Sequence, residues 1–193
     1  MAGQARYTAL LDACVLYPLA MTDALLSLAT TGLFAAKWTT RIEEEWIAAL
    51  ERQRPDLIGR LEVRRHSMRE AVVDWEIPER AWRHRLPGIT LPDENDVHVL
   101  AAALAGHVDC IVTLNLKDFP AEVLDGFGVA VIHPDTFLVH QWDLEPDTAV
   151  EAFRRMRARR RSPSSSPLEF AEALRKAGLP MLAERLAAAA GRI

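Results

Sequence analysis

The sequence predicts an α/β protein with a central parallel sheet flanked by helices and a helical appendage at its C-terminal end. Two observations support this prediction. Short apolar segments rich in β-branched residues alternate with longer segments whose apolar residues recur at helical spacing, as in strands joined by crossover helices. After Pro146 the pattern contains helices alone. We therefore divide the chain into an α/β domain, residues 1–143, and a C-terminal helical region, residues 144–193.

The composition is that of an ordinary globular protein. Its 193 residues are 50% hydrophobic, which is enough to bury the core of one domain with a small addition. Cys14 and Cys110, the two cysteines, have no spacing typical of a metal site or a disulfide framework, so we expect a reducing, cytoplasmic location. Asp12, Pro18 and Asp23 interrupt the first apolar region, which predicts neither a membrane span nor a signal peptide.

The first half of the chain is expected to contain two short buried strands followed by helices. The strands are apolar, and the helices carry apolar residues three or four positions apart. Pro18 is expected in the first turn of the first helix, and Thr40 to Glu43 form a capping-box pattern at the start of the second. The expected elements are strand Tyr7–Leu11, helix Ala20–Ala29, strand Phe34–Trp38, a helix from Thr40, and a helix Pro55–Trp75 that buries Leu57, Ile58, Leu61, Met68 and Val72.

The second half gives a clear pattern everywhere except at residues 76–88. Three further apolar segments are expected to be strands, and an Ala-rich segment that ends at Gly106 is expected to be a helix. After Pro146, two helical segments follow a first one across a Ser-rich linker. The expected elements are strand Ile89–Leu91, helix Val97–Leu104, strand Asp109–Thr113, strand Val129–Ile132, helix Asp147–Arg161, linker Ser162–Pro167, and helices Phe170–Ala177 and Met181–Ala190.

Charge is distributed unevenly along the chain. Residues 86–153 contain one basic and 12 acidic residues, whereas residues 154–193 contain ten basic and three acidic residues. A region so rich in carboxylates is either widely exposed to water or neutralised by bound cations. Because residues 86–153 are net acidic and residues 154–193 are net basic, we predict that residues 146–193 pack on the α/β domain and contribute to partner or substrate binding. The six arginines between residues 154 and 161 suit RNA phosphates, a solvated helix face or the acidic region.

Acidic residues lie where this fold would bring them together. Asp12 directly follows the first strand, without an evident capping pattern, and Asp118 lies just past the strand Asp109–Thr113. Both are therefore expected at the carboxyl edge of the sheet, where open α/β sheets bind ligands. Asp93 and Asp96 stand at the start of the helix that precedes this strand.

Helix geometry ranks the three glutamates at positions 43 to 45. At about 100° per residue, Glu44 points away from the apolar stripe of its helix, and its two neighbours flank the stripe. Glu43 already has a place as the capping-box partner. Glu45 is therefore the better candidate to reach a site beside the core.

A set of oxygen ligands without sulfur or imidazole suits Mg²⁺ or Mn²⁺. Such an ion would neutralise carboxylates that otherwise have no basic neighbours in the sequence. One or two ions would bind a scissile phosphate, activate water and stabilise the leaving oxygen. The acidic residues therefore suggest a metal-dependent hydrolase.

Four segments, LLDACVLYP, IEEEW, LPDENDVHVLAAAL and IVTLNLKDFP, resemble in this order the motifs of the PIN-domain nucleases. Within that family the chain resembles the bacterial VapC-like toxins, in particular a subgroup with an additional C-terminal helical region. The resemblance covers about residues 5–140. It implies a PIN-like parallel sheet and a metal-dependent endoribonuclease that acts on RNA such as tRNA. It also implies a cognate antitoxin, a homodimer and no membrane association.

The resemblance also assigns roles to single residues. Its acidic positions are matched by four residues that we predict to be both catalytic and metal-binding: Asp12, Glu45, Asp96 and Asp118. Asp93 is a fifth predicted metal ligand, or else a helix cap. Thr113 and Asn115 are the predicted substrate-binding residues. Where a further acid or small polar residue is expected near Asp96, the chain has Glu94 and Asn95, which leaves the number of carboxylates at the metal open.

Two other functions stay open on the sequence. One is a phosphoryl hydrolase with Asp12 as nucleophile, although Cys14 stands where such an enzyme would carry its second acid. The other is a non-catalytic α/β interaction module whose acids hold a structural cation. Taken singly, Asp96 is explained by the helix dipole and Asp118 by turn chemistry, so the nuclease prediction depends on the whole set.

Overall fold

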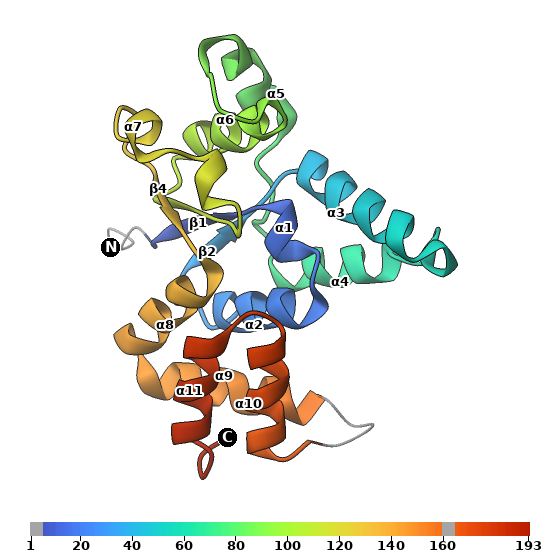
Figure 1. Cartoon of the computed structure of the whole chain (residues 1–193), viewed down its shortest axis with the longest axis vertical. Helices are drawn as coiled ribbons and strands as arrows, with labels where there is room; N and C mark the ends of the chain where they lie inside the picture. Colours follow the sequence, from blue (N-terminus) through green and yellow to red (C-terminus); the bar gives the residue numbers. More distant parts are fainter. Residues whose placement is uncertain (1–5, 160–164) are drawn as a thin grey trace.

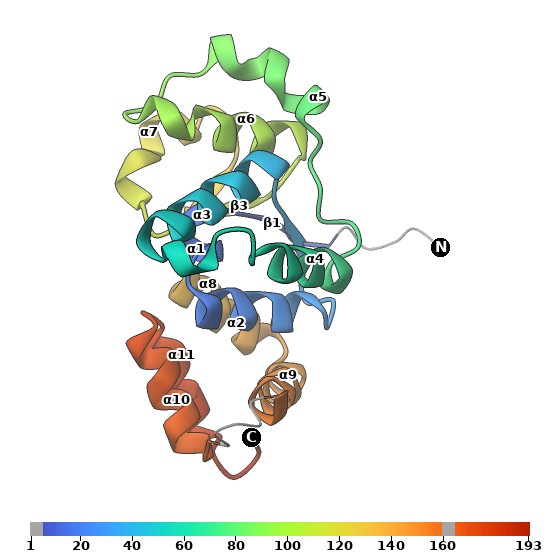
Figure 2. The same ribbon diagram turned by 90° about the vertical axis from the view of Figure 1, so that its right-hand side faces the viewer.

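The computed structural model, which describes residues 6–159 and 165–193, has a four-stranded parallel sheet at its centre (Figure 1). The strands lie in the order β2-β1-β3-β4, and every pairing is parallel. Helix α6 lies on one side of the sheet and helices α2 and α8 on the other (Figure 2). The prediction of a helix-flanked parallel sheet with a C-terminal helical appendage is confirmed.

The strands are short and mostly buried, so their carboxyl ends define one narrow edge. They are β1 (Thr8–Leu11), β2 (Ala35–Lys37), β3 (Cys110–Val112) and β4 (Ala130–Ile132). The central pair aligns Leu11 with Val112, and the amide of Asp12 continues the ladder by donating to the Val112 carbonyl at 3.2 Å. This register places the residue after β1 beside the residue after β3.

Helices and short 3-10 turns connect the strands. The α/β part contains α1 (Ala13–Leu16), α2 (Leu19–Ala29), α3 (Thr40–Gln53), η1 (Pro55–Leu57), α4 (Glu62–Ala71), α5 (Glu79–Trp82), η2 (Arg83–Gly88), η3 (Glu94–Asp96), α6 (Val97–Ala105), η4 (Leu116–Asp118), α7 (Ala121–Leu124) and α8 (Pro134–Leu144). The appendage contains α9 (Pro146–Arg159), α10 (Pro167–Lys176) and α11 (Pro180–Ala188). Within the described residues, no helix is both long and apolar enough to cross a membrane.

The predicted helix Pro55–Trp75 is wrong as one element. It is divided into η1 and α4, and Ile58, which we expected to be buried, is 63% exposed. The division occurs at Gly59, whose φ of +71° lies in the left-handed region that favours glycine. A local conformation available to glycine therefore overrides the apolar spacing on both sides.

Two further expectations about local structure are corrected. Residues Ile89–Leu91 form no strand, and residues 76–88, which gave no clear pattern, fold into α5 and η2. The buried indole of Trp82 packs against α6, and both α5 and η2 contact that helix. Helix α8 was not expected from the sequence. It begins where Pro134 takes the first helical position and the ring of His133 accepts the Asp135 amide.

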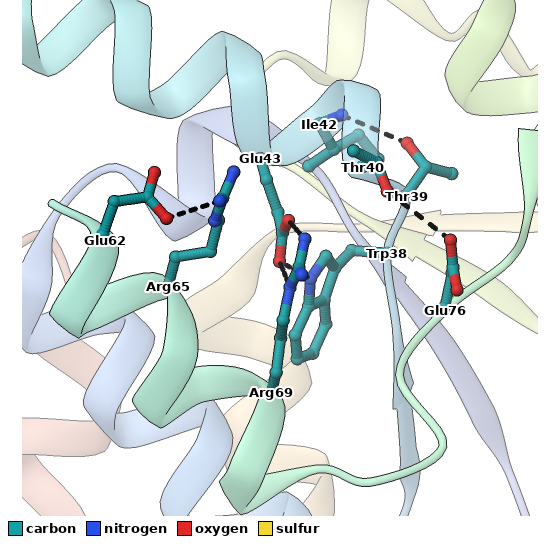
Figure 3. A network of polar contacts seen from close by, with 9 residues as sticks. All are labelled: Trp38, Thr39, Thr40, Ile42, Glu43, Glu62, Arg65, Arg69 and Glu76. Atoms are coloured by element: carbon teal, nitrogen blue, oxygen red, sulfur yellow. Dashed lines mark hydrogen bonds and ion pairs between the residues drawn. The ribbon is translucent and has the colours of Figure 1, made fainter. Parts of the chain in front are cut away.

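The buried Glu43 network fixes the start of α3 (Figure 3). The N-cap is Thr39, which accepts the Ile42 amide at 3.1 Å, so the expected capping box beginning at Thr40 is wrong. Glu43 is instead buried and accepts hydrogen bonds from Trp38 Nε1 at 2.9 Å and from the Arg69 guanidinium. This cluster joins the end of β2 to α3 and α4, and it sets the orientation of the helix that carries Glu45.

The C-terminal helices pack on the α/β part, as predicted. Helix α9 lies against α2 and α8, and the hairpin of α10 and α11 reaches α8 (Figures 1 and 2). The buried carboxylate of Asp135 in α8 accepts the amides of Met181 and Leu182 at 2.8 and 2.9 Å, and so caps the first turn of α11. Trp142 of α8 stacks on Phe153 of α9 with ring centroids 5.8 Å apart.

The described arginines of residues 154–161 are engaged within the chain. Arg154 and Arg155 pair with Glu151, and Arg159 donates to Asp23 and Ser27 of α2. Arg157 donates to the carbonyls of residues 165 and 193. The last two arginines of this run, and residues 162–164 of the predicted linker, lie outside the described residues.

Candidate active site

Asp12 occupies the centre of the site at the end of β1. It is 4% exposed, and one carboxylate oxygen accepts the Ala13 amide at 2.6 Å, which makes Asp12 the N-cap of α1. The sequence gave no evident capping pattern here, because α1 is a single turn without amphipathic spacing. Asp12 therefore has a structural role beside any chemical one.

The other oxygen of Asp12 is held by side chains from two elements. Thr113, fully buried at the end of β3, donates to Asp12 Oδ2 at 2.7 Å and accepts the Asn115 amide at 3.0 Å. Cys14 Sγ lies 3.1 Å from the same oxygen and accepts the Leu114 amide at 3.2 Å. Burial, followed by the charge of Asp12, raises the pKa of Cys14 to about 12, so the thiol keeps its proton and acts as a donor.

Glu45 reaches the site from α3, and its neighbour Glu44 is exposed. Its Oε1 lies 3.3 Å from Arg41 Nε and 2.8 Å from His98 Nε2. His98 is 1% exposed, and neither of its ring nitrogens has a well-directed hydrogen bond, so its contact with Glu45 is a close approach without hydrogen-bond geometry. The tilted ring of Trp82, centred 6.0 Å away, lies beside His98.

Asp96 lies between η3 and α6, and all the other predicted ligands contribute to its pKa. It is half-buried, and this burial raises its pKa to about 7, with further contributions from four carboxylates: Asp12, Asp93, Asp118 and Glu45. Asp93 itself is exposed and caps η3 by accepting the Asn95 amide at 2.9 Å. Burial is the larger cause of this shift and the neighbouring carboxylates add to it, so Asp96 lies in negative surroundings that a bound cation would compensate.

Several of the residues described above border one cavity of about 470 Å³ at the carboxyl edge of the sheet. Its walls include three of the predicted catalytic residues and one predicted substrate-binding residue, namely Asp12, Glu45, Asp96 and Asn115. Asp118 and Thr113 are not part of the wall. A larger cavity of about 560 Å³ between α2 and α4 contains Asp23 as its one acidic residue, so it lacks the crowded carboxylates of the first.

The donor set has the chemistry of a magnesium or manganese site, because all its members are carboxylates. Among residues 6–159 and 165–193, however, no three histidine, cysteine, aspartate or glutamate side chains stand close enough to hold one ion together. The contacts of the carboxylates explain this, since Asp12 is turned to Ala13 and Thr113, and Glu45 to Arg41. The Glu45 side chain is 36% exposed, so it can reorient at little cost.

A parallel α/β sheet with carboxylates from three elements bordering a cavity at its carboxyl edge defines the class of proteins to which this fold belongs. The chain matches the family model "PIN domain" over residues 8–117, more than half of its length, and it belongs to the PIN-domain family. Residues 134–188 match a second model, "VapC50 C-terminal domain". That match begins with α8, upstream of the predicted division after residue 143.

One relative was found among well-described proteins, and it is similar over a limited segment. A protein of Mycobacterium tuberculosis (strain ATCC 25618 / H37Rv) named "Putative ribonuclease VapC50" is 49% identical over 49 residues. This segment is 25% of the present chain and 29% of the relative, so less than a third of the relative is covered. No solved structure matches the chain.

Proposed function

We propose that this protein is a metal-dependent endoribonuclease and the toxin of a toxin-antitoxin pair. The observation that supports this most strongly is the group of carboxylates at one cavity: Asp12, Glu45 and Asp96 line it, and burial followed by the neighbouring carboxylates raises the pKa of Asp96 to about 7. Such a group of acids is costly unless a cation binds to it. Membership of the PIN-domain family and similarity to a protein named as a ribonuclease support the same activity.

The proposed metal is Mg²⁺ or Mn²⁺, and its proposed ligands are the four carboxylates Asp12, Glu45, Asp96 and Asp118. Asp93 stays a predicted fifth ligand, because both of its hydrogen bonds within the described chain use one oxygen, Oδ1. When bound, the ion would polarise the scissile phosphate and lower the pKa of water. The carboxylates are also the proposed catalytic residues.

The remaining residues prepare this site. Thr113 and Cys14 donate to Oδ2 of Asp12, which fixes the plane of that carboxylate. Asn115 stands exposed at the cavity wall, so its amide is available to a bound nucleotide. Thr113 is fully buried, and we assign to it the orientation of Asp12 and of the Asn115 backbone in place of direct substrate contact.

RNA is the proposed substrate, and tRNA or another structured RNA is the finer proposal. The family likeness further suggests a cognate antitoxin, a homodimer and a cytoplasmic location without membrane association. The antitoxin and the second subunit would contact surfaces outside the carboxylate cavity. We therefore treat them as consequences of the toxin proposal.

The proposal is tested by RNA cleavage in Mn²⁺ with matched substitutions. Asp12→Asn, Asp96→Asn and Glu45→Gln each remove a proposed ligand charge, and we expect cleavage to fall by at least about a hundredfold. Glu145→Gln is the matched control, because Glu145 is an exposed glutamate between α8 and α9 and lies outside the carboxylate cavity.

Two outcomes would contradict the proposal. If Asp12→Asn cleaves RNA as well as the unmodified chain, the assignment of the site is wrong. If calorimetry shows Mn²⁺ binding and no RNA pool is cleaved, the protein is a non-catalytic module with a structural cation.

A further inference from the structure

The segment formed by α5 and η2, residues 79–88, presents a cluster of cations on the surface. Arg80, Arg83, His84 and Arg85 are all exposed. The segment is nonetheless firmly seated, since Trp82 in its middle is 2% exposed. Exposed cations on an anchored support keep a fixed position relative to the rest of the molecule.

This cation cluster adjoins the carboxylate cavity through a chain of contacts. Trp82 lies beside His98, and His98 Nε2 lies 2.8 Å from Glu45 Oε1. Arg41, one turn before Glu45 on α3, lies 3.3 Å from the same oxygen. Arg41 also borders a surface hollow together with Arg83. Both views show α5, α6 and the start of α3 at the end of the molecule opposite the C-terminal helices (Figures 1 and 2).

The cations of this cluster are poorly neutralised by the protein itself. Arg80 and Arg85 have no hydrogen-bond or ion-pair partner among the described residues, and Arg83 has a single exposed contact of 3.5 Å with Glu79. Elsewhere the chain provides acceptors, as for Arg154 and Arg155, which share Glu151. Free guanidinium groups beside a phosphodiester-cleaving site are suited to bidentate contacts with phosphate oxygens.

We propose that residues 79–88 and Arg41 form the surface that binds the RNA backbone and leads a strand into the carboxylate cavity. This proposal rests on the proposed ribonuclease function. The cavity itself carries negative charge and repels a polyanion, so affinity for RNA has to come from cations beside it. Contacts with phosphates alone would position a strand without selecting its sequence.

A protein partner fits this surface less well. Stable protein interfaces have an apolar core inside a polar rim. No large exposed hydrophobic side chain of the described chain lies in residues 79–88. The exposed side chains of the segment are mainly cationic, which favours a phosphate backbone over a protein segment.

The test compares two double substitutions in the full-length chain. Arg80→Ala/Arg85→Ala removes the two unpaired guanidinium groups of the cluster. Arg52→Ala/Arg60→Ala is the matched control, because it removes two exposed arginines at and beyond the far end of α3. Binding to a fluorescein-labelled single-stranded RNA of about 20 nucleotides is measured by anisotropy in EDTA over a range of salt concentrations, where counterion release reports phosphate contacts.

We expect the cluster variant to bind about 25-fold more weakly at about 0.1 M salt, because two lost phosphate contacts each remove about 0.7 log unit there. Its salt-dependence slope should fall by about 1.4, and the control should stay within about twofold. Arg80→Lys/Arg85→Lys, which keeps the charge, should keep the slope. Circular dichroism melting checks that all variants are folded.

The proposal is overturned if the cluster variant binds RNA as the unmodified chain does, or if the control loses as much affinity. It is also overturned if the cluster variant binds RNA normally but is no longer inhibited by a cognate antitoxin. That result would identify residues 79–88 as a protein-binding surface. Hydrolysis of bis(p-nitrophenyl) phosphate in Mn²⁺ separates this proposal from the proposed function. That substrate is too short to reach residues 79–88, so its hydrolysis should be equal in all variants, and its absence in the unmodified chain would count against the nuclease alone.

Discussion

Protonation of Asp96 should control metal binding in the neutral pH range. Its pKa of about 7 in the metal-free protein results first from burial and then from the carboxylates around it. A metal ion needs the ionised carboxylate, so below this pKa it has to displace a proton. Metal affinity should therefore depend on pH where an ordinary aspartate, with a pKa near 3.8, would give no dependence.

The size of this pH dependence follows from one proton that competes with the metal ion for Asp96. With a pKa of about 7, roughly nine in ten Asp96 side chains are protonated at about pH 6 and roughly one in ten at about pH 8. The apparent dissociation constant for Mn²⁺ should be about tenfold larger at the lower pH. Binding should release about 0.9 proton there and about 0.1 proton at the higher pH.

Calorimetric titration of Mn²⁺ into the metal-free protein, in two buffers of different ionisation enthalpy, measures both quantities. Glu94→Gln serves as the control, because it removes an exposed neighbouring charge and should keep the pH dependence. Asp96→Asn should abolish the proton release. An affinity and a proton count that stay constant between the two pH values would contradict the assignment of Asp96 as a metal ligand.

The same shift has a signed effect on folding stability. The folded-state pKa of Asp96 lies above the unfolded value, so the folded protein binds more protons between about pH 4 and pH 7. The Asp96 contribution to the free energy of unfolding therefore falls as pH rises through this window, and it is constant above it. Urea denaturation of the metal-free chain, compared with Asp96→Asn at each pH, measures that contribution, and a rise with pH would contradict the assignment.

Three further predictions concern the supports of the site. Thr113→Val removes the hydroxyl that donates to Asp12 and should lower single-turnover RNA cleavage about tenfold, whereas Thr113→Ser should retain it. Glu43→Gln leaves the guanidinium of Arg69 without its carboxylate and should cost about 3 kcal/mol, read as a fall of about 8 °C in melting temperature; an unchanged melting temperature would argue against a structural ion pair. Asp135→Ala uncaps α11 and should cost about 2 kcal/mol locally, so amide exchange in α11 should quicken about thirtyfold while β1 is unaffected.

The parallel sheet and part of the site could be predicted because they follow from local rules. Parallel strands end at a common edge, so an acid after β1 and an acid just past β3 were expected near each other. Helical geometry distinguished Glu45 from Glu44, and the structure has Glu45 in the cavity wall and Glu44 exposed. Each of these inferences needs only the period of one element and the polarity of the sheet.

The residues that orient the acidic side chains could not be predicted in the same way. Thr113 holds Asp12 through a contact between the ends of two strands about a hundred residues apart in sequence, and no local pattern encodes that pairing. Residues 76–88 gave no pattern because their turns are too short for a helical period. Their position depends on the packing of α5 and η2 against α6, in which Trp82 is the buried side chain. Local rules therefore located Asp12, Glu45 and Asp96 at the cavity, but Asp118 lies outside its wall, and these rules could not identify what orients the acids.

Glu45 lies between the proposed RNA-binding surface and the carboxylate cavity. Both of its contacts in the described chain, to Arg41 and to His98, use Oε1. Oε2 has no such contact, so the carboxylate can accept from Arg41 with one oxygen and face the cavity with the other. A phosphate bound to Arg41 would compete with Oε1 for the guanidinium and weaken that hydrogen bond, which would leave Glu45 free to turn toward a bound metal ion. Binding of RNA and completion of the ligand set would then favour each other, and Mn²⁺ affinity should rise when a non-cleavable RNA strand is bound.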